Sequence, residues 1–200
     1  MRKYTLLIGL LITITSLSYA QAPHPGSLKL TNQNWVDGIV DINSFINSAI
    51  VTTDDERQLT YHASMIQEIT TVDECDRQRT FRTFDYRSNG FFDRMEKKVF
   101  QVVSDGSVTL LRRVFEYDIF DAEDEYTVEE WYYVEEGKVE RIRNFRRQVL
   151  PLMADYAKEM KEFRRLNKLR NLNNDVSMYL MVSYYNRLRS LEEQSLLSQR

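Results

Sequence analysis

Few side chains in this sequence are of the types that carry catalysis or bind metals, apart from its many carboxylates. There are two histidines, and they are far apart: His24 lies near the start and His62 stands alone in TYHAS, so neither has a partner at the spacing of a zinc site. Cys75 lies in no motif of a catalytic nucleophile. The six glycines form no run that would cradle a phosphate. We predict no catalytic residue, no metal site and no cofactor.

Carboxylates keep one enzymatic alternative open. A glycosidase needs two correctly spaced carboxylates, and a sequence does not reveal their distance in space. Glu129 and Glu130 are adjacent in a predicted strand, so they point to opposite sheet faces and cannot work as a pair. An acidic run has oxygen ligands for calcium but lacks the glycine and spacing of an EF-hand loop, which favours a solvated loop. This run contains Asp118, Asp121, Glu123, Asp124 and Glu125.

Aromatic and basic residues offer a possible contact surface. In EEWYYVEEG, strand alternation places Trp131 and Tyr133 on one face and Tyr132 on the other. Exposed aromatic rings on a sheet suit sugars or partner proteins. The other interpretation is that one set packs under the C-terminal helices and the other lines the remaining core.

Charge is distributed unevenly along the chain. Residues 21–137 carry 11 basic and 23 acidic side chains, whereas residues 138–170 carry 11 basic and 4 acidic ones, a net charge of +7. Such a basic stretch suits anionic lipid, or its cations lie beside the acid-rich sheet. Nucleic acid is not expected for an acidic chain without an aromatic-basic binding motif. The contact surface we consider consists of Trp131, Tyr133, Lys158 and Arg165.

The first residues have the three-part pattern of a secretory signal peptide. Arg2 and Lys3 precede an apolar run that ends in small residues, with cleavage after Ala20 or, alternatively, after Ala22. The apolar run is shorter than the roughly 20 residues of a membrane-spanning helix. We expect export to the periplasm or the cell exterior without a transmembrane segment. Cys75 is the only cysteine, so it is buried, tolerated or free to pair between chains, and its acidic neighbours argue against a redox role.

The sequence after the signal peptide predicts an α+β fold. A flexible leader at 21–27 precedes a small, bent, barrel-like β subdomain at 28–72, in which Gly38 marks a bend rather than a binding site. An antiparallel meander follows at 79–143, with hairpin turns at Asp105-Gly106 and Glu136-Gly137.

Apolar residues then recur with a helical period, which predicts two helices within 148–191. The first begins near Pro151 and buries Tyr156, Met160 and Phe163, and the second is capped by Asp175. We expect both helices to pack on the meander, so that 28–191 folds as one unit, and residues 192–200 to form a frayed tail.

The order of these motifs resembles a large group of uncharacterised exported proteins of Bacteroidota. The resemblance covers a strand pair at 28–40, a strand edge at 61–66, the hairpin at 105–110, the hairpin at 132–134, and a final Tyr185-Asn186 pair. It implies a fold and a compartment but no activity.

The first strand pair also resembles the opening of Sm-like small barrels, through Leu30, Asn32, Val36, Gly38 and Val40. Gln33 stands where that pattern has its first glycine, and no second Sm motif follows. This resemblance implies a bent barrel and not RNA binding. The function we predict is a non-enzymatic binding or interaction module of the cell envelope, with an unknown envelope component or protein as partner. A carboxylate-based hydrolase is the alternative.

Overall fold

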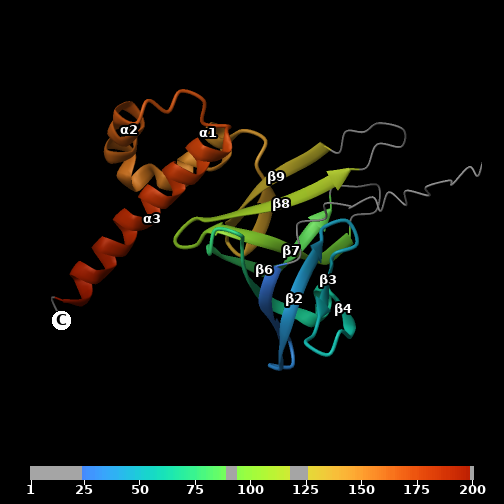
Figure 1. Cartoon of the computed structure of the whole chain (residues 1–200). Helices are drawn as coiled ribbons and strands as arrows, with labels where there is room; N and C mark the ends of the chain where they lie inside the picture. Colours follow the sequence, from blue (N-terminus) through green and yellow to red (C-terminus); the bar gives the residue numbers. More distant parts are fainter. Residues whose placement is uncertain (1–23, 89–93, 118–125, 199–200) are drawn as a thin grey trace, which may run out of the picture.

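The fold combines one ten-stranded antiparallel sheet with a layer of C-terminal helices, which confirms the α+β class (Figure 1). It is known from a computed structural model that describes residues 24–88, 94–117 and 126–198. The expected signal peptide and the acidic run at 118–125 lie outside these residues. The strand order is β10-β9-β8-β7-β6-β5-β1-β2-β3-β4, and the sheet does not close.

The first five strands pair as a meander whose fifth strand returns to the first. They are β1 (His24–Leu30), β2 (Trp35–Asn43), β3 (Ser48–Thr52), β4 (Gln58–His62) and β5 (Ile66–Val72). A short 3₁₀ helix, η1 (Ala63–Met65), joins β4 to β5. Our prediction of a leader to residue 27 is wrong, because β1 already pairs with β2 at His24. Pro25 is tolerated there because it lies at the start of the strand, beyond the first residue paired with β5.

The next five strands continue the same sheet, because β6 pairs with β5. They are β6 (Gln78–Ser88), β7 (Arg94–Ser104), β8 (Thr109–Tyr117), β9 (Tyr126–Glu135) and β10 (Lys138–Arg141). The hairpins at Asp105-Gly106 and Glu136-Gly137 are confirmed. Gly106 and Gly137 have φ of 149° and 77°, and these turns favour a residue without a Cβ.

The helical part differs from the two helices that we expected. It contains α1 (Phe145–Gln148), η2 (Leu150–Tyr156), α2 (Ala157–Leu166) and α3 (Asp175–Leu197). Met153 has non-helical dihedrals, so the region after Pro151 is a kinked 3₁₀ segment rather than the first turns of one α-helix. Asn174, not Asp175, caps α3, by accepting a 2.7 Å hydrogen bond from the Ser177 N–H. The expected frayed tail is helical as far as Leu197.

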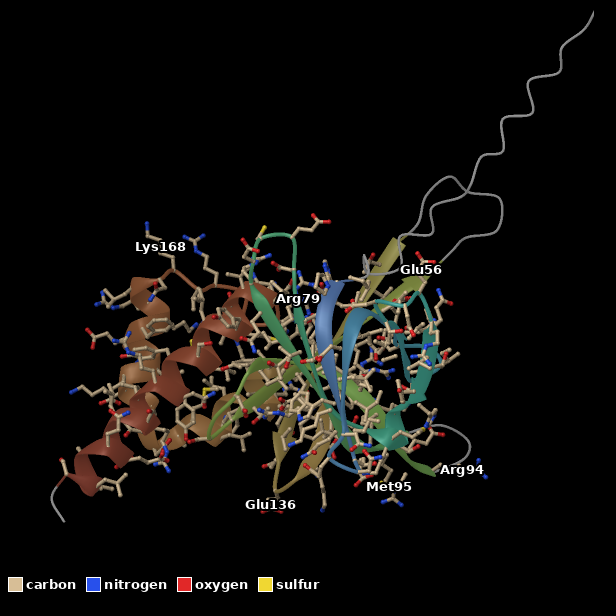
Figure 2. The ribbon with its side chains drawn as sticks, turned by 60° about the horizontal axis from the view of Figure 1, so that its bottom comes forward. Glu56, Arg79, Arg94, Met95, Glu136 and Lys168 are labelled. Atoms are coloured by element: carbon tan, nitrogen blue, oxygen red, sulfur yellow. The ribbon has the colours of Figure 1, made fainter. Side chains whose placement is uncertain are left out.

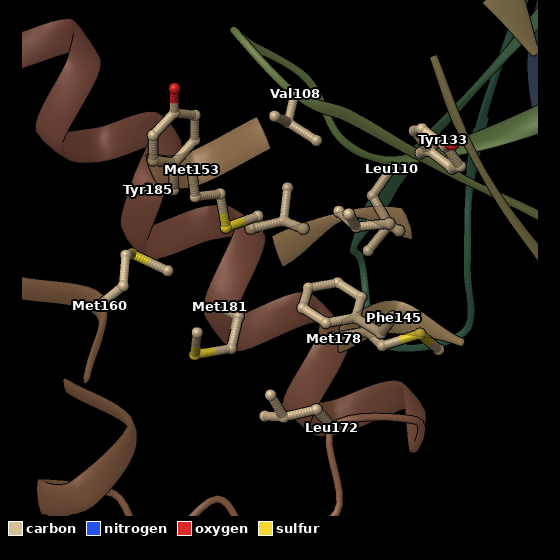
Figure 3. Packing of buried hydrophobic residues seen from close by; sticks show 12 residues of the cluster. Val108, Leu110, Tyr133, Phe145, Met153, Met160, Leu172, Met178, Met181 and Tyr185 are labelled. Carbon is tan, nitrogen blue, oxygen red and sulfur yellow. The ribbon is translucent and has the colours of Figure 1, made fainter. Parts of the chain in front are cut away.

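Buried side chains gather in three clusters along the sheet. One fills the β1–β5 region, a second lies among β6–β10 around Phe100 and Tyr132, and the third joins the helices to the sheet. In the third cluster, Val108, Leu110 and Tyr133 contribute from the sheet, and methionines contribute from the helices (Figure 3). The helices therefore share a core with the meander. Among the described helices, none has the length and apolar character needed to span a membrane.

Candidate functional site

The most distinctive surface feature lies in the helical layer, where α1, η2, α2 and α3 surround a hollow of about 440 Å³. Seven of its ten lining residues are apolar and the other three are basic. Met153, Met160 and Met181 form its floor and are almost fully buried. We call this feature the methionine hollow. It is lined by Arg146, Leu150, Pro151, Met153, Ala154, Ala157, Met160, Lys161, Arg164 and Met181.

The methionine floor follows from the local sequence. Met160 is the apolar residue that α2 turns towards the core, while its basic residues occupy the other faces. Met153 comes from the kinked η2, and Met181 comes from the buried side of α3. Thioether side chains are unbranched and flexible, so a wall of methionines adapts to ligands of different shape. The volume falls within the range of about 300–1,000 Å³ that is usual for small-molecule sites.

A second hollow of about 440 Å³ adjoins the first and shares Lys161 and Arg164 with it. Five of its six lining residues are cations, and we call it the cationic hollow. It is lined by Lys161, Arg164, Arg165, Lys168, Leu169 and Arg170. An apolar space and a basic space therefore lie next to each other on one side of the helical layer.

Backbone carbonyls hold two of the guanidinium groups at these hollows. Arg164 Nε donates to the Leu169 carbonyl at 3.1 Å, and a terminal nitrogen of Arg146 donates to the Arg170 carbonyl at 3.1 Å. Both acceptors belong to the loop between α2 and α3. Because a guanidinium has five N–H donors, each arginine is positioned while most of its donors stay available.

The basic side chains of this region do not pair with the acid-rich sheet. Within the described part of the chain, none of the cations that line the two hollows makes an ion pair. The sheet instead neutralises its own carboxylates, for example through Arg82 with Glu68 and Arg112 with Glu129. The alternative in which cations of the basic stretch lie beside sheet carboxylates is therefore not observed for the cations of the hollows, whereas Arg141 on β10 does pair with Glu130 at 2.7 Å.

The predicted contact surface is divided between different places. Tyr133 is 5% exposed and packs beneath the helices, so its ring offers no surface for a ligand. Trp131 lies at the edge of the same cluster, with the Arg112 guanidinium 5.7 Å from its ring centroid. Arg165 is exposed and lines the cationic hollow, whereas Lys158 is exposed on α2 and lines neither hollow. Tyr132 occupies the opposite sheet face, as the strand alternation predicted.

Sequence reasoning missed a buried cation, Arg113, which is 5% exposed on β8. It donates hydrogen bonds to the Ser44 carbonyl and to Asn47 Oδ1, and it lies 4.8 Å from the Phe115 ring centroid. Burial lowers the pKa of its guanidinium from the ordinary value. Arg113 therefore anchors the β2–β3 loop across the sheet. Its place in the RRVF run of an amphipathic strand carries no signal that separates it from the partly buried Arg112.

The remaining candidates of the sequence lie elsewhere. Cys75 is exposed in the β5–β6 turn, where its N–H donates to Asp73 Oδ1 at 2.9 Å. His62 is exposed and its Nδ1 lies 3.0 Å from Ser64 Oγ. Among the described residues, no three His, Cys, Asp or Glu side chains are grouped as metal ligands. Neither the methionine hollow nor the cationic hollow is lined by a carboxylate.

The comparisons with known proteins add no relative: no protein-family model, no curated protein and no solved structure matches the chain.

Proposed function

We propose that this protein is a non-enzymatic binding module of the cell envelope, and that its ligand is an anionic amphiphile held in the helical layer. The observation that carries the proposal is the sharing of Lys161 and Arg164 between an apolar hollow and a cationic one. An apolar chain in the methionine hollow would lose its contact with water, which is favourable by about 25 cal/mol per Å² of buried apolar area. Its anionic head would then lie among side chains that have no acidic partner in the described chain.

Charge selects this occupant over others. A neutral apolar ligand would use the methionine floor but leave the surrounding cations unpaired, and a purely polar anion would leave the floor exposed to water. A small anionic amphiphile would cover the methionine floor and also pair with the cations. The carboxylate-based hydrolase stays a prediction, and neither of the two hollows offers it a carboxylate. The pattern of the first residues supports export of the chain.

A fluorescence titration with 11-(dansylamino)undecanoic acid tests the proposal. We expect saturable binding with a blue shift of the dansyl emission, as the dye leaves water. Ala157→Phe should abolish this binding, because Ala157 is exposed and lines the methionine hollow, so the added ring fills space without removing core atoms. Ser190→Phe, which adds the same ring to an exposed position of α3 outside both hollows, is the matched control.

The neutral amide of the same probe should bind more weakly than the acid. Equal affinity of acid and amide, or unchanged binding by Ala157→Phe, would contradict the proposed function.

A further inference from the structure

The ending of α2 shows how the cationic hollow is built. Asn167 follows the last helical residue, and Lys168 takes the left-handed conformation with φ of 53°. The Lys168 N–H donates to the Arg165 carbonyl at 3.2 Å, and the Leu169 N–H donates to the Arg164 carbonyl at 3.0 Å. This pair of hydrogen bonds is a Schellman motif, in which the left-handed position is usually glycine. A lysine there is conformationally unfavourable.

The cations of this hollow also repel one another. Lys161 and Arg165 are four residues apart within α2, and like charges at this spacing destabilise a helix. The negative end of the helix dipole offsets part of this repulsion for Arg164 and Arg165 in the last turn. The carboxylates of α2, Glu159 and Glu162, do not line the hollow and make no ion pair with its cations. Figure 2 shows Lys168 on the outer side of the helical layer.

We infer that the cationic hollow is a head-group site for a phosphate monoester, so that the ligand of the proposed function is a phosphate-bearing amphiphile rather than a carboxylate. This inference rests on the proposed function and refines it. A phosphate monoester presents three acceptor oxygens and a charge of about −1.5 to −2 at neutral pH. Arginine matches phosphate oxygens with pairs of parallel N–H bonds, and lysine adds point charges. A single carboxylate would use fewer of the five cations that line the hollow.

The test is calorimetric titration of the full protein with dodecyl phosphate and with dodecanoate, which share one chain, below the concentrations at which they form micelles. We expect dodecyl phosphate to bind at least about fivefold more tightly, the effect of a single additional charge-assisted hydrogen bond at a partly exposed site. Lys168→Gly should bring the two affinities together while raising the melting temperature, because glycine relieves the left-handed position. Lys158→Ala is the control, because it also removes one lysine charge but at a position of α2 that lines neither hollow. It should preserve the tighter binding of dodecyl phosphate.

The outcomes separate this inference from the proposed function. Equal, Ala157→Phe-sensitive binding of both amphiphiles would overturn the phosphate inference and leave the binding function intact. A preference unchanged in Lys168→Gly would also overturn it, since that variant stays folded. Absence of binding by either amphiphile would overturn the proposed function itself. If inorganic phosphate bound as tightly as dodecyl phosphate, the dodecyl group would contribute nothing to affinity. That result would overturn the proposal that the ligand is an amphiphile.

Discussion

The Asn186 side chain on α3 pairs with both backbone groups of Val108 in the β7–β8 hairpin. Asn186 Oδ1 accepts the Val108 N–H at 3.0 Å, and Nδ2 donates to the Val108 carbonyl at 2.8 Å. The same Nδ2 lies 3.3 Å from the Asp105 carbonyl. An amide side chain thus continues the strand pairing at the end of the sheet and fixes the angle at which the helical layer meets it. Met181 of the same helix lines the methionine hollow, so the position of that hollow depends on this helix.

Asn186→Ala should lower the free energy of unfolding by about 1–3 kcal/mol, because the partly buried groups of Val108 lose their partners. Urea denaturation measures the change. Arg187→Ala, at the next and exposed position, is the control and should change stability by less than about 0.5 kcal/mol. Equal effects of the two substitutions would show that the hydrogen bonds between Asn186 and Val108 do not contribute to the free energy of unfolding.

Gly106 should be coupled energetically to Asn186. A Cβ built on Gly106 would lie 2.6 Å from Asn186 Cγ, so Gly106→Ala forces the asparagine out of place. We expect Gly106→Ala to cost less in an Asn186→Ala background than in the wild type, with a coupling of about 0.5–3 kcal/mol in a double-mutant cycle. The strain from φ of 149° remains in both backgrounds. Additive effects would contradict the direct contact.

Gly38 has a structural role, as the strand pattern predicted. Its φ is 157°, and an added Cβ would lie 2.3 Å from the Thr52 carbonyl oxygen on β3. Gly38→Val should therefore destabilise the protein by at least about 1–3 kcal/mol, the cost of an unfavourable backbone conformation, with the steric clash in addition. Thermal unfolding provides the measurement, with Asp37→Val on the exposed neighbour as control. An unchanged melting temperature would refute this role.

Asp73 should make stability depend on acidity. Its burial opposes ionisation, but donors from Arg77, Cys75 and Arg79 outweigh this effect and hold the pKa of the carboxyl well below its usual range. A lowered pKa in the folded state stabilises the fold above the unfolded pKa of about 3.9, and the contribution disappears as the pH falls below that value.

The stability difference between wild type and Asp73→Asn should therefore be present at neutral pH and shrink progressively below about pH 4. Unfolding by urea at a series of pH values measures it. The exposed Glu74→Gln is the control for a general loss of negative charge. A difference that stays constant to low pH would mean that the hydrogen bonds to Asp73 do not depend on its charge.

The parts of the fold that the sequence predicted are those set by neighbouring residues. Alternation in the five N-terminal strands and glycine-containing turns at Gly106 and Gly137 depend on local backbone preferences, and both are observed. The kink at Met153 was missed, because proline is equally compatible with the first turn of an α-helix and with a 3₁₀ segment. The tail at 192–200 was predicted to be frayed, but α3 continues to Leu197.

The two hollows were not predictable, because they require distances between separate helices. Met160 was predicted as a helix core position, but only the tertiary arrangement brings it together with Met153 and Met181 and leaves an open space above them. Arg165 was identified from the density of basic residues, whereas the roles of Lys161 and Lys168 depend on how α2 ends. Arg113 depends on the distant β2–β3 loop, which a local pattern does not reveal.

Nuclear magnetic resonance of the methionine methyl groups tests the central claim most directly. In protein labelled with ¹³C at the methionine methyls, and assigned by single Met→Leu substitutions, added dodecyl phosphate should shift the signals of Met153, Met160 and Met181, which line the methionine hollow. Met65 and Met95 are exposed on the sheet side of the molecule and should not shift. If the ligand binds but the shifts appear at Met65 or Met95 while the three hollow methionines stay unchanged, the methionine hollow is not the binding site and the account is wrong.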